Sequence, residues 1–528
     1  MIYIMLGSII GIRLGIYKDI SLFILAIIIM FLIYILNIRK NLNLKDRYFL
    51  RKEILLRDYL PVIKIKDILV FVISTMFFVV YINIFETRYI NFENNLLFKN
   101  KYSYEKIYIL SKRESEYNKI YTVYLIDEKA FGDIKCSKKN KESLKVGKAY
   151  LGKVKFNKLE DEFNPNGFSE RKYNLSRFKK FKGKGEFFKE KNIDVPVYIK
   201  ALGNIFKLKE KIYLNYGKYI KEKIALGITL GDKEFLEREI LEDFKKLNIY
   251  HILSVSGMHI SLLIFILSNL KMYFKKIIKV KGLDYVLDLI NLIILISYII
   301  LTSFSVSTIR AFLMYYLAVF FRKLNLSVRF IDILAFVFVL NVLINPYLIF
   351  FAGIYLSFMA VFGIKITGYI LETKNALILI LVINILMQPV LIYFTSILSL
   401  NFLLGNIVIT SFSTCIIILT NIFILLFSFN IIIFKFNLFI SVILKYILTP
   451  IYSLLAFGIN VLNKILIFLI KALKPLTFED VYMESFSLYF YIIYYILIYF
   501  IFKSIKIMKK KKEYLMLNIF EGESSEEE

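Results

Sequence analysis

The sequence has few of the residues that build disulfides, metal sites and nucleotide-binding loops. It contains two cysteines, two histidines, seven prolines and no tryptophan in 528 residues. Cys136 and Cys415 lie in a polar and an apolar segment respectively, which predicts no disulfide framework and no metal site. No Gly-x-x-x-x-Gly-Lys-Ser/Thr phosphate loop is present, so energy for any transport would come from another protein. We expect no cofactor.

Long uncharged apolar runs are the main feature of the sequence. Hydrophobic residues make up 58% of the chain and aromatic residues 17%. A helix needs about twenty apolar residues to cross a bilayer. Met1–Tyr17 lacks a small-residue cleavage site, which favours an uncleaved span over a signal peptide. The sequence predicts a polytopic α-helical membrane protein with apolar runs at Ile20–Ile38, Ile68–Phe85, Leu289–Ile309, Ala311–Phe321 and Asn375–Phe434.

The distribution of positive charge predicts the orientation of the first spans. The net charge of +28 is compatible with nucleic-acid binding, but also with lysine-rich cytoplasmic loops. Arg39–Asp67 carries nine Lys and Arg residues, which predicts a cytoplasmic loop. The third apolar run, Ile68–Phe85, then crosses the membrane from the cytoplasm to the outside. The polar segment that follows it is therefore expected outside the cytoplasm. Lys509–Lys512 predicts a cytoplasmic C-terminus, ahead of a disordered acidic tail at Glu521–Glu528, although the topology of the last third stays open.

Residues 86–208 have the composition and turn spacing expected of a small β domain. Lys119–Ile126, Ala149–Phe156 and Val195–Lys200 are rich in β-forming residues, and Asn164–Gly167 has turn composition. Several short strands in this length predict an inserted extracytoplasmic β-barrel, with an OB-like barrel favoured. Its Lys and Tyr residues could bind phosphates and stack on bases of single-stranded nucleic acid. A solvated, lysine-rich β domain fits the composition equally well.

The rest of the chain is predicted to form one membrane domain with interrupted helices. Lys211–Leu247 predicts two amphipathic helices joined near Leu230–Asp232, and Leu289–Thr302 and Ser307–Phe321 predict a helical pair. Interruptions are expected at Asn345-Pro346, Gly353, Gln388-Pro389 and Gly405-Asn406, a pattern of transport pathways as well as of kinked structural helices. The predicted divisions are 1–85 for the N-terminal helices, 86–208 for the β domain, 209–505 for the membrane channel domain and 506–528 for the tail.

Both histidines lie in His251-Ile-Leu-Ser-Val-Ser-Gly-Met-His259, at the start of an apolar run. On a helix His251 and His259 would share one stripe, with Ser254 and Ser256 each three residues from a histidine and Gly257 allowing close approach. Such costly polar groups either face water or substrate, or hold neighbouring helices together. An intramembrane Ser/His hydrolase is an alternative, but no nucleophile elbow is present and no carboxylate follows within the run.

Arg310 is the only charged residue between Asp288 and Arg322. A guanidinium inside an apolar helix is a candidate for an anion pathway. A buried ion pair with Asp232, Asp288 or Asp332 is an equal alternative.

The His251–His259 stretch resembles the signature of the ComEC-type competence family, the inner-membrane DNA channel of natural transformation. Further stretches resemble the family in the same order: Asn164-Pro-Asn-Gly-Phe168, Leu230-Gly-Asp232, Phe304-Ser-Val-Ser-Thr-Ile-Arg-Ala311, Asn345-Pro346, Gly353-Ile-Tyr-Leu-Ser-Phe358, Gln388-Pro389 and Asn406. Two positions depart from the family pattern, since Tyr355 replaces a glutamine and no proline follows Asn406. The resemblance covers nearly the whole chain.

The resemblance implies a channel, not an enzyme, that conducts single-stranded DNA across the cytoplasmic membrane. Implied partners are a DNA receptor, an ATP-driven translocase and other copies of the chain. The metallo-β-lactamase-like nuclease domain of many relatives is not expected here, so an alternative is a channel subunit whose nuclease is a separate chain. The expected pathway residues are Asp232, His251, Ser254, Ser256, Gly257, His259, Ser307, Arg310, Asn345, Gly353, Ser357 and Asn406.

Overall fold

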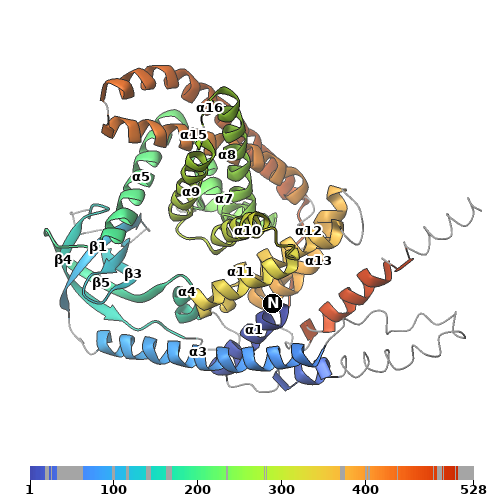
Figure 1. The fold of residues 1–528 in the computed structure, drawn as a ribbon. Helices are drawn as coiled ribbons and strands as arrows, with labels where there is room; N and C mark the ends of the chain where they lie inside the picture. The colour runs from blue at the N-terminus through green and yellow to red at the C-terminus, as the bar shows by residue number, and fades with distance from the viewer. Residues whose placement is uncertain are drawn as a thin grey trace, which may run out of the picture. The chain divides into compact units, whose positions relative to one another are not determined.

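The structure is a computed structural model of the chain (Figure 1). It divides into two compact units, formed by residues 1–86, 328–398 and 482–528 (unit 1) and by residues 87–327 and 399–481 (unit 2). The residues that the structure describes are 1–17, 23–24, 26–31, 64–97, 102–114, 118–137, 144–161, 169–232, 236–278, 280, 282–368, 375–398, 401, 405–436, 438–479, 481–483, 490–491, 493–505 and 507–508.

Among these residues six helices are long and apolar enough to cross a membrane. This confirms the prediction of a mostly helical chain with several helices that are long and apolar enough to span a membrane. The candidate spans are Ile65–Leu97, Gly257–Ile277, Leu283–Leu301, Leu377–Thr395, Gly405–Ile431 and Tyr446–Leu476. Most of the predicted Ile20–Ile38 run, the basic loop, the Asn164–Gly167 turn and the tail from residue 509 lie outside the described residues.

In unit 1, a stripe of glycines joins α1 (Ile2–Tyr17) to α3 (Ile65–Leu97). Gly7, Gly11 and Gly15 recur every fourth residue, and a Cβ atom at Gly11 would lie 2.4 Å from the Thr75 carbonyl oxygen. Small residues at this spacing let two helices in a membrane approach closely, where van der Waals packing replaces the hydrophobic effect. The stripe therefore sets the contact between α1 and α3.

The Gly11→Ala variant is expected to lower the free energy of unfolding by about 1–3 kcal/mol, because the added methyl overlaps backbone. Gly217→Ala is the matched control, since a Cβ at Gly217 meets nothing within 4 Å. That variant should instead gain about 0.5–1 kcal/mol, because alanine is the better helix former. Unfolding of both proteins in the same detergent checks the opposite signs, and equal stability of Gly11→Ala and wild type would contradict the packing argument.

Also in unit 1, two apolar helices flank a short 3₁₀ segment. α11 (Phe330–Ile344) ends at Asn345, η5 spans Pro346–Phe350 and α12 spans Ala352–Ile366, which confirms the interruption expected at Asn345-Pro346. The break at Asn345-Pro346 arises because proline cannot continue the preceding helix. The interruption expected at Gln388-Pro389 is wrong: Pro389 lies within the continuous helix α13 (Ala376–Thr395).

Five strands of unit 2 close into a barrel in the order β1-β2-β3-β5-β4, in which β3 and β5 run parallel (Figure 1). Alternating residues of these strands fill the barrel core, as β3 shows by alternating buried and more exposed positions. Burial raises the pKa of the Cys136 thiol to about 12, so this thiol stays protonated. The predicted strands near 119–126 and 149–156 are confirmed. The strands are β1 (Ser103–Glu114), β2 (Asn118–Leu125), β3 (Ala130–Ser137), β4 (Ala149–Asn157) and β5 (Lys179–Glu190).

The strand predicted at Val195–Lys200 is wrong, because α5 (Val197–Tyr219) begins there, directly after Pro196. Ile199, Gly203 and Phe206 are buried at helical spacing, and this tertiary packing overrides the β propensity of the local sequence. Ile199 and Phe206 belong to the barrel core, whereas Ile212 and Tyr216 further along belong to the helical core of unit 2. One helix thus contributes to both cores.

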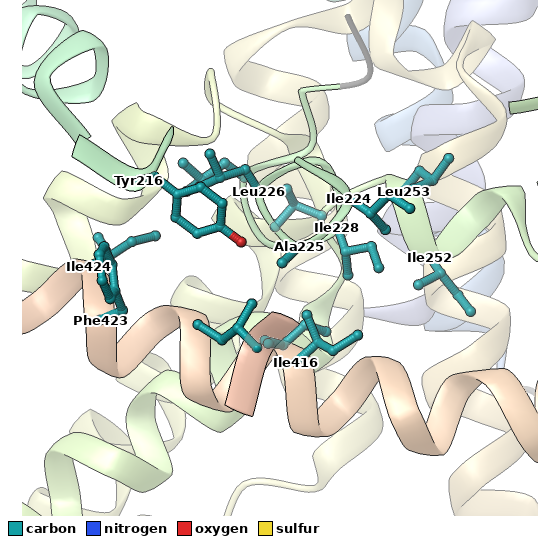
Figure 2. Packing of buried hydrophobic residues seen from close by; sticks show 14 of the residues in the cluster. Tyr216, Ile224, Ala225, Leu226, Ile228, Ile252, Leu253, Ile416, Phe423 and Ile424 are labelled. Carbon is teal, nitrogen blue, oxygen red and sulfur yellow. The ribbon is translucent and has the colours of Figure 1, made fainter. Parts of the chain in front are cut away.

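The helical core of unit 2 is built around α6 (Ile224–Leu230), whose residues are all buried (Figure 2). α7 (Arg238–Lys246), α8 (Gly257–Ile277), α15 (Thr410–Phe436) and α16 (Leu438–Leu473) complete its surroundings. The prediction of two amphipathic helices in Lys211–Leu247 is therefore wrong, since α6 is a separate, fully buried helix. The predicted junction is correct: Gly231 ends α6 in the left-handed conformation, with φ of 76°.

Candidate functional site

The first candidate site is the segment between α6 and α8 in unit 2. After Gly231 the chain passes through α7 and the 3₁₀ turn η4 (Tyr250–Leu253), and then extends through Ser254 and Ser256 to the start of α8. Ser254 Oγ donates to the His251 carbonyl oxygen at 2.6 Å, so it stabilises the turn. The Ser254 and His251 side chains are both exposed.

The expected helical stripe of His251 and His259 is wrong. His251 lies in η4, whereas α8 begins only at Gly257 and contains His259. The helix starts there because Ser256 is its N-cap residue, in extended conformation, and its backbone N–H bonds to the His259 side chain. A Cβ at Gly257 would lie 3.6 Å from the Ala311 side chain, which is an ordinary contact.

His259 connects two helices through both ring nitrogens and is 0% exposed. Its Nε2 lies 3.0 Å from the Ile228 carbonyl oxygen of α6, and because a carbonyl only accepts, Nε2 carries the hydrogen. Nδ1 then accepts from the Ser256 backbone N–H at 3.0 Å. The structure therefore favours the structural reading of this histidine, which ties the start of α8 to α6.

Ser256 Oγ also lies 3.0 Å from His259 Nδ1, the geometry that a serine–histidine dyad would need. A general base must accept the hydroxyl proton, but Nδ1 already accepts a backbone hydrogen bond. The opposite nitrogen donates to a carbonyl rather than to a carboxylate, so a protonated imidazole would gain no compensating negative charge. The arrangement is better suited to capping a helix than to nucleophilic catalysis.

Asp232 is held in an ion pair that the sequence did not suggest. Its carboxylate lies 2.6 Å from Lys209 Nζ and also accepts from the Tyr213 hydroxyl, both on α5. Lys209 is 8% exposed, so this pair is largely removed from water. Asp232 thus anchors the end of α6 to α5.

Arg310 lies on α10 (Val306–Lys323) and is 2% exposed, which places a guanidinium inside the helical part of unit 2. Asp232, Asp288 and Asp332 each form an ion pair with another cation, namely Lys209, Lys271 and Arg329. Ser307, one turn before Arg310, is half-buried.

The turn into α10 is conformationally unusual. Ser303 and Phe304 both have φ of 56°, a region that residues with a side chain rarely adopt. Ser305 Oγ then donates to the Val255 carbonyl oxygen at 3.2 Å, which joins this turn to the extended segment before α8. Two of the segments that resemble the competence family, His251–His259 and Phe304–Ala311, are therefore in direct contact.

Two asparagines begin the α15 region. Asn406 lies in a π-helical turn (Gly405–Ile409), and its side-chain oxygen accepts from Thr410 at 3.4 Å. Asn401, which the sequence did not single out, is 1% exposed and donates to the carbonyl oxygens of Lys246 and Phe478. Its own oxygen accepts from the Phe478 N–H at 2.7 Å. Asn401 thus fastens the end of α7 to the chain after α16.

The remaining predicted residues belong to unit 1. Asn345 is 2% exposed and accepts from the Tyr347 N–H at 3.1 Å, so it caps η5. Gly353 and Ser357 lie on α12, and Ser357 is half-buried.

Unit 1 contains a half-buried cation, Arg13, that was not among the predicted site residues. Arg13 Nη2 donates to the Tyr393 hydroxyl at 2.5 Å, and its guanidinium lies 5.5 Å from the centre of the Tyr393 ring and 5.8 Å from that of Tyr17. Arg13 is the only charged side chain in Met1–Tyr17. Like Arg310, Arg13 is therefore a single charged residue within an apolar helix, and this feature is visible in the sequence.

The second candidate site is a row of lysines on the outer face of the barrel. Lys135 on β3 pairs in register with Lys184 on β5, which pairs in register with Lys155 on β4. All three side chains are exposed, and no carboxylate partner is found for them among the described residues. Like charges opposite one another destabilise a sheet, so this lysine row is suited to a polyanionic ligand.

A pocket of about 500 Å³ adjoins the lysine row. Tyr102 on its rim donates to Glu186 at 2.8 Å, and the Lys153 ammonium lies 5.2 Å from the centre of the Tyr102 ring. An aromatic ring beside exposed lysines is the combination that binds bases and phosphates of a single strand. The residues that line the pocket are Tyr102, Asn118, Lys135, Ser137, Lys184, Gly185 and Glu186.

Comparison with known proteins gives a family and a curated relative. ComE operon protein 3 of Bacillus subtilis (strain 168) is 26% identical over 159 residues, which cover 28% of this chain and 18% of that protein. The chain therefore spans less than a fifth of this relative's length in the match. No solved structure matches the chain. The sequence profile described as Competence protein matches residues 228–507, more than half of the chain and every predicted pathway residue. The chain therefore belongs to the Competence protein family.

Proposed function

We propose that this protein conducts single-stranded DNA inward across the cytoplasmic membrane during natural transformation. Membership of the Competence protein family supports a role in DNA uptake. The candidate spans support a multi-pass membrane location. The observation that carries the proposal is the lysine row, because three exposed cations in cross-strand register fit a phosphate backbone.

The barrel would receive the strand outside the cytoplasm. Its strand order and its parallel β3–β5 pair support an OB-like barrel, a fold that binds oligonucleotides over the face of its second and third strands. The pocket includes Asn118 of β2 and Lys135 and Ser137 of β3, which is the corresponding face. Phosphates would bind the lysine row while a base stacks on Tyr102.

Replacing Lys135, Lys155 and Lys184 together with glutamine tests the proposal. The affinity of the purified full-length protein for single-stranded DNA is expected to fall and to become less salt-dependent. Each lost phosphate contact should reduce the slope of log K against log salt by about 0.7. Uptake of labelled DNA by cells that carry only the variant should fall with it.

The control is a second triple glutamine variant with the same change of charge, at Lys106, Lys148 and Lys200. These lysines are also in this unit, but each forms an ion pair, with Asp127, Glu190 and Asp194 respectively. The control should bind DNA nearly as the wild type does. An equal loss in both variants would show that only overall charge matters and would remove the lysine row from the proposal.

The alternative of a Ser/His hydrolase is supported only by the 3.0 Å contact between Ser256 Oγ and His259 Nδ1. A fluorophosphonate probe, which reacts with activated serines, should leave Ser256 unmodified. Labelling that disappears in Ser256→Ala would establish the hydrolase. We further propose that a DNA receptor, an ATP-driven translocase and a separate nuclease act with this chain, and that it carries no catalytic residue of its own.

A further inference from the structure

Two helix ends in unit 2 each carry a cation that lies against a tyrosine ring. At the end of α4 (Glu170–Ser176), the Arg177 guanidinium lies 4.5 Å from the centre of the Tyr173 ring. At the end of α7, the Lys245 ammonium lies 5.7 Å from the centre of the Tyr250 ring. Both distances are within the range of a cation–π interaction. The two rings therefore restrict the positions of the two cations.

The charges of these two cations are not neutralised by an ion pair. Both side chains are exposed, and no carboxylate partner is found for either in the part of the chain that the structure describes. The acidic residues of α7 interact instead with Lys474, whose Nζ lies 2.6 Å from the Asp243 carboxylate and which is also attracted by Glu239 and Glu242. Accessible charges that are held in place but not neutralised favour an anionic ligand.

The two cation–tyrosine pairs lie close to each other. Burial raises the pKa of the Tyr250 hydroxyl, and the electrostatic effect of the nearby Tyr173 hydroxyl raises it further. α4 packs against strand β5 of the barrel, whereas Tyr250 directly precedes the His251–His259 segment at the start of α8. The pairs are therefore at the junction between the barrel and the helical part of unit 2.

Phe178 adds an exposed aromatic ring directly after Arg177. Its side chain is 39% exposed, and its φ of 61° is a conformation that bulky residues rarely adopt. Its backbone N–H donates to the Leu175 carbonyl oxygen at 3.0 Å, which closes the end of α4. Backbone conformations of this kind are concentrated at sites that hold ligands. An exposed ring next to a guanidinium provides a surface on which a base can stack.

We propose that Tyr173, Arg177, Phe178, Lys245 and Tyr250, here called the junction cluster, form a second contact site for single-stranded DNA in addition to the lysine row; this proposal rests on the function proposed above. Phosphates bind Arg177 and Lys245, and a base stacks on Phe178. The cluster leads a strand that leaves the barrel to the start of α8. Two contact sites on one strand bind long strands more tightly than short ones.

Photocrosslinking with single-stranded DNA that contains iodouracil tests the proposal, because this base crosslinks to aromatic side chains on which it stacks. The full-length protein in nanodiscs is irradiated with the DNA, and crosslinked peptides are identified by mass spectrometry. Crosslinks are expected at Phe178 and at Tyr102 of the pocket. Tyr198 is the control that should not crosslink, because it is 59% exposed but no cation lies against its ring among the described residues.

The crosslinking results separate the junction cluster from the proposed function. Crosslinks at Tyr102 without any at Phe178 would overturn the cluster and leave the proposed function intact. Crosslinking of Tyr198 as strong as that of Phe178 would also overturn the cluster, because it would show that exposure alone determines the reaction. A protein that binds no single-stranded DNA would overturn both proposals.

The double variant Arg177→Gln, Lys245→Gln measures the contribution of the two cations. A strand of about 6 nucleotides is within the site size of one OB barrel, so the variant should bind it as the wild type does. A strand of about 30 nucleotides reaches both sites, and its affinity should fall about tenfold. The control variant Lys106→Gln, Lys148→Gln removes the same charge from two ion-paired lysines and should bind both strands normally.

The dependence on strand length also distinguishes the two DNA contacts. The triple glutamine variant of the lysine row should lose affinity for both strands, whereas the double variant of the junction cluster should lose affinity only for the long one. Wild-type affinity of the double variant for the long strand would overturn the junction cluster. An equal loss for both strands would overturn it as well, because the two cations would then act within the barrel site.

Discussion

Cells whose only copy of this protein carries Arg310→Ala are expected to lose DNA uptake, while the protein still folds and inserts. Arg310 is 2% exposed, and a cation retained inside an apolar helix is a functional residue by default. Each phosphate that enters a medium of low polarity loses its hydration, and a fixed guanidinium offsets part of that cost. Entry of labelled single-stranded DNA into the cytoplasm measures the effect.

The controls separate a role in the pathway from a role in folding. Arg322→Ala removes an exposed charge at the end of the same helix and should leave uptake unchanged. Arg310→Lys keeps the positive charge but loses the planar guanidinium, which can donate two hydrogen bonds to one phosphate. This variant should therefore retain part of the uptake. Normal uptake by Arg310→Ala would remove this residue from the pathway. A variant that fails to insert would point instead to a structural role.

Replacing Lys209 with methionine is expected to lower the free energy of unfolding by about 3 kcal/mol, because it leaves the Asp232 carboxylate without its cation in a largely buried position. The side chain of Asp232 is 25% exposed and that of Lys209 is 11% exposed, so the lower end of the range for buried pairs applies. Denaturant unfolding in detergent measures the change.

The double variant Lys209→Met, Asp232→Leu distinguishes the two roles proposed for Asp232. Replacing both members of a buried pair with apolar residues is often neutral, so stability should return to near the wild-type value. If Asp232 serves only to hold α5 and α6 together, DNA uptake returns as well. A stable double variant without uptake would place the carboxylate in the pathway, as the family resemblance implies.

The parts of the fold that the sequence predicted are those governed by hydrophobic periodicity and by strong breakers. α10 has nearly the expected bounds, and α9 (Leu283–Leu301) ends where expected, because apolar runs of this length end where basic residues or turn residues begin. α9 begins six residues before the expected Leu289, since the helix also includes Asp284 and Asp288. The strands at 118–125 and 149–157 were readable for the same reason. The burial of Ile199 and Phe206 decides the conformation of Val195–Lys200, and that contact is not visible in the local sequence.

The candidate site was predicted in composition but not in geometry. The sequence brought attention to His259 and Ser256, and the two side chains do meet. The predicted helix wrongly included His251, because a helix begins after Ser256. The sequence contains the signal for this start, since Ser256 with His259 three residues later has the spacing of a capping box. Lys209, Asn401 and the lysine row depend on pairings between distant segments, so periodicity alone could not reveal them.

The passage of α5 from one hydrophobic core into the other has a thermodynamic consequence. Melting the barrel exposes Ile199 and Phe206, and unravelling that end of the helix weakens the support for Ile212 and Tyr216 in the bundle. Heat should therefore dismantle the two regions in a single concerted transition rather than in separate stages.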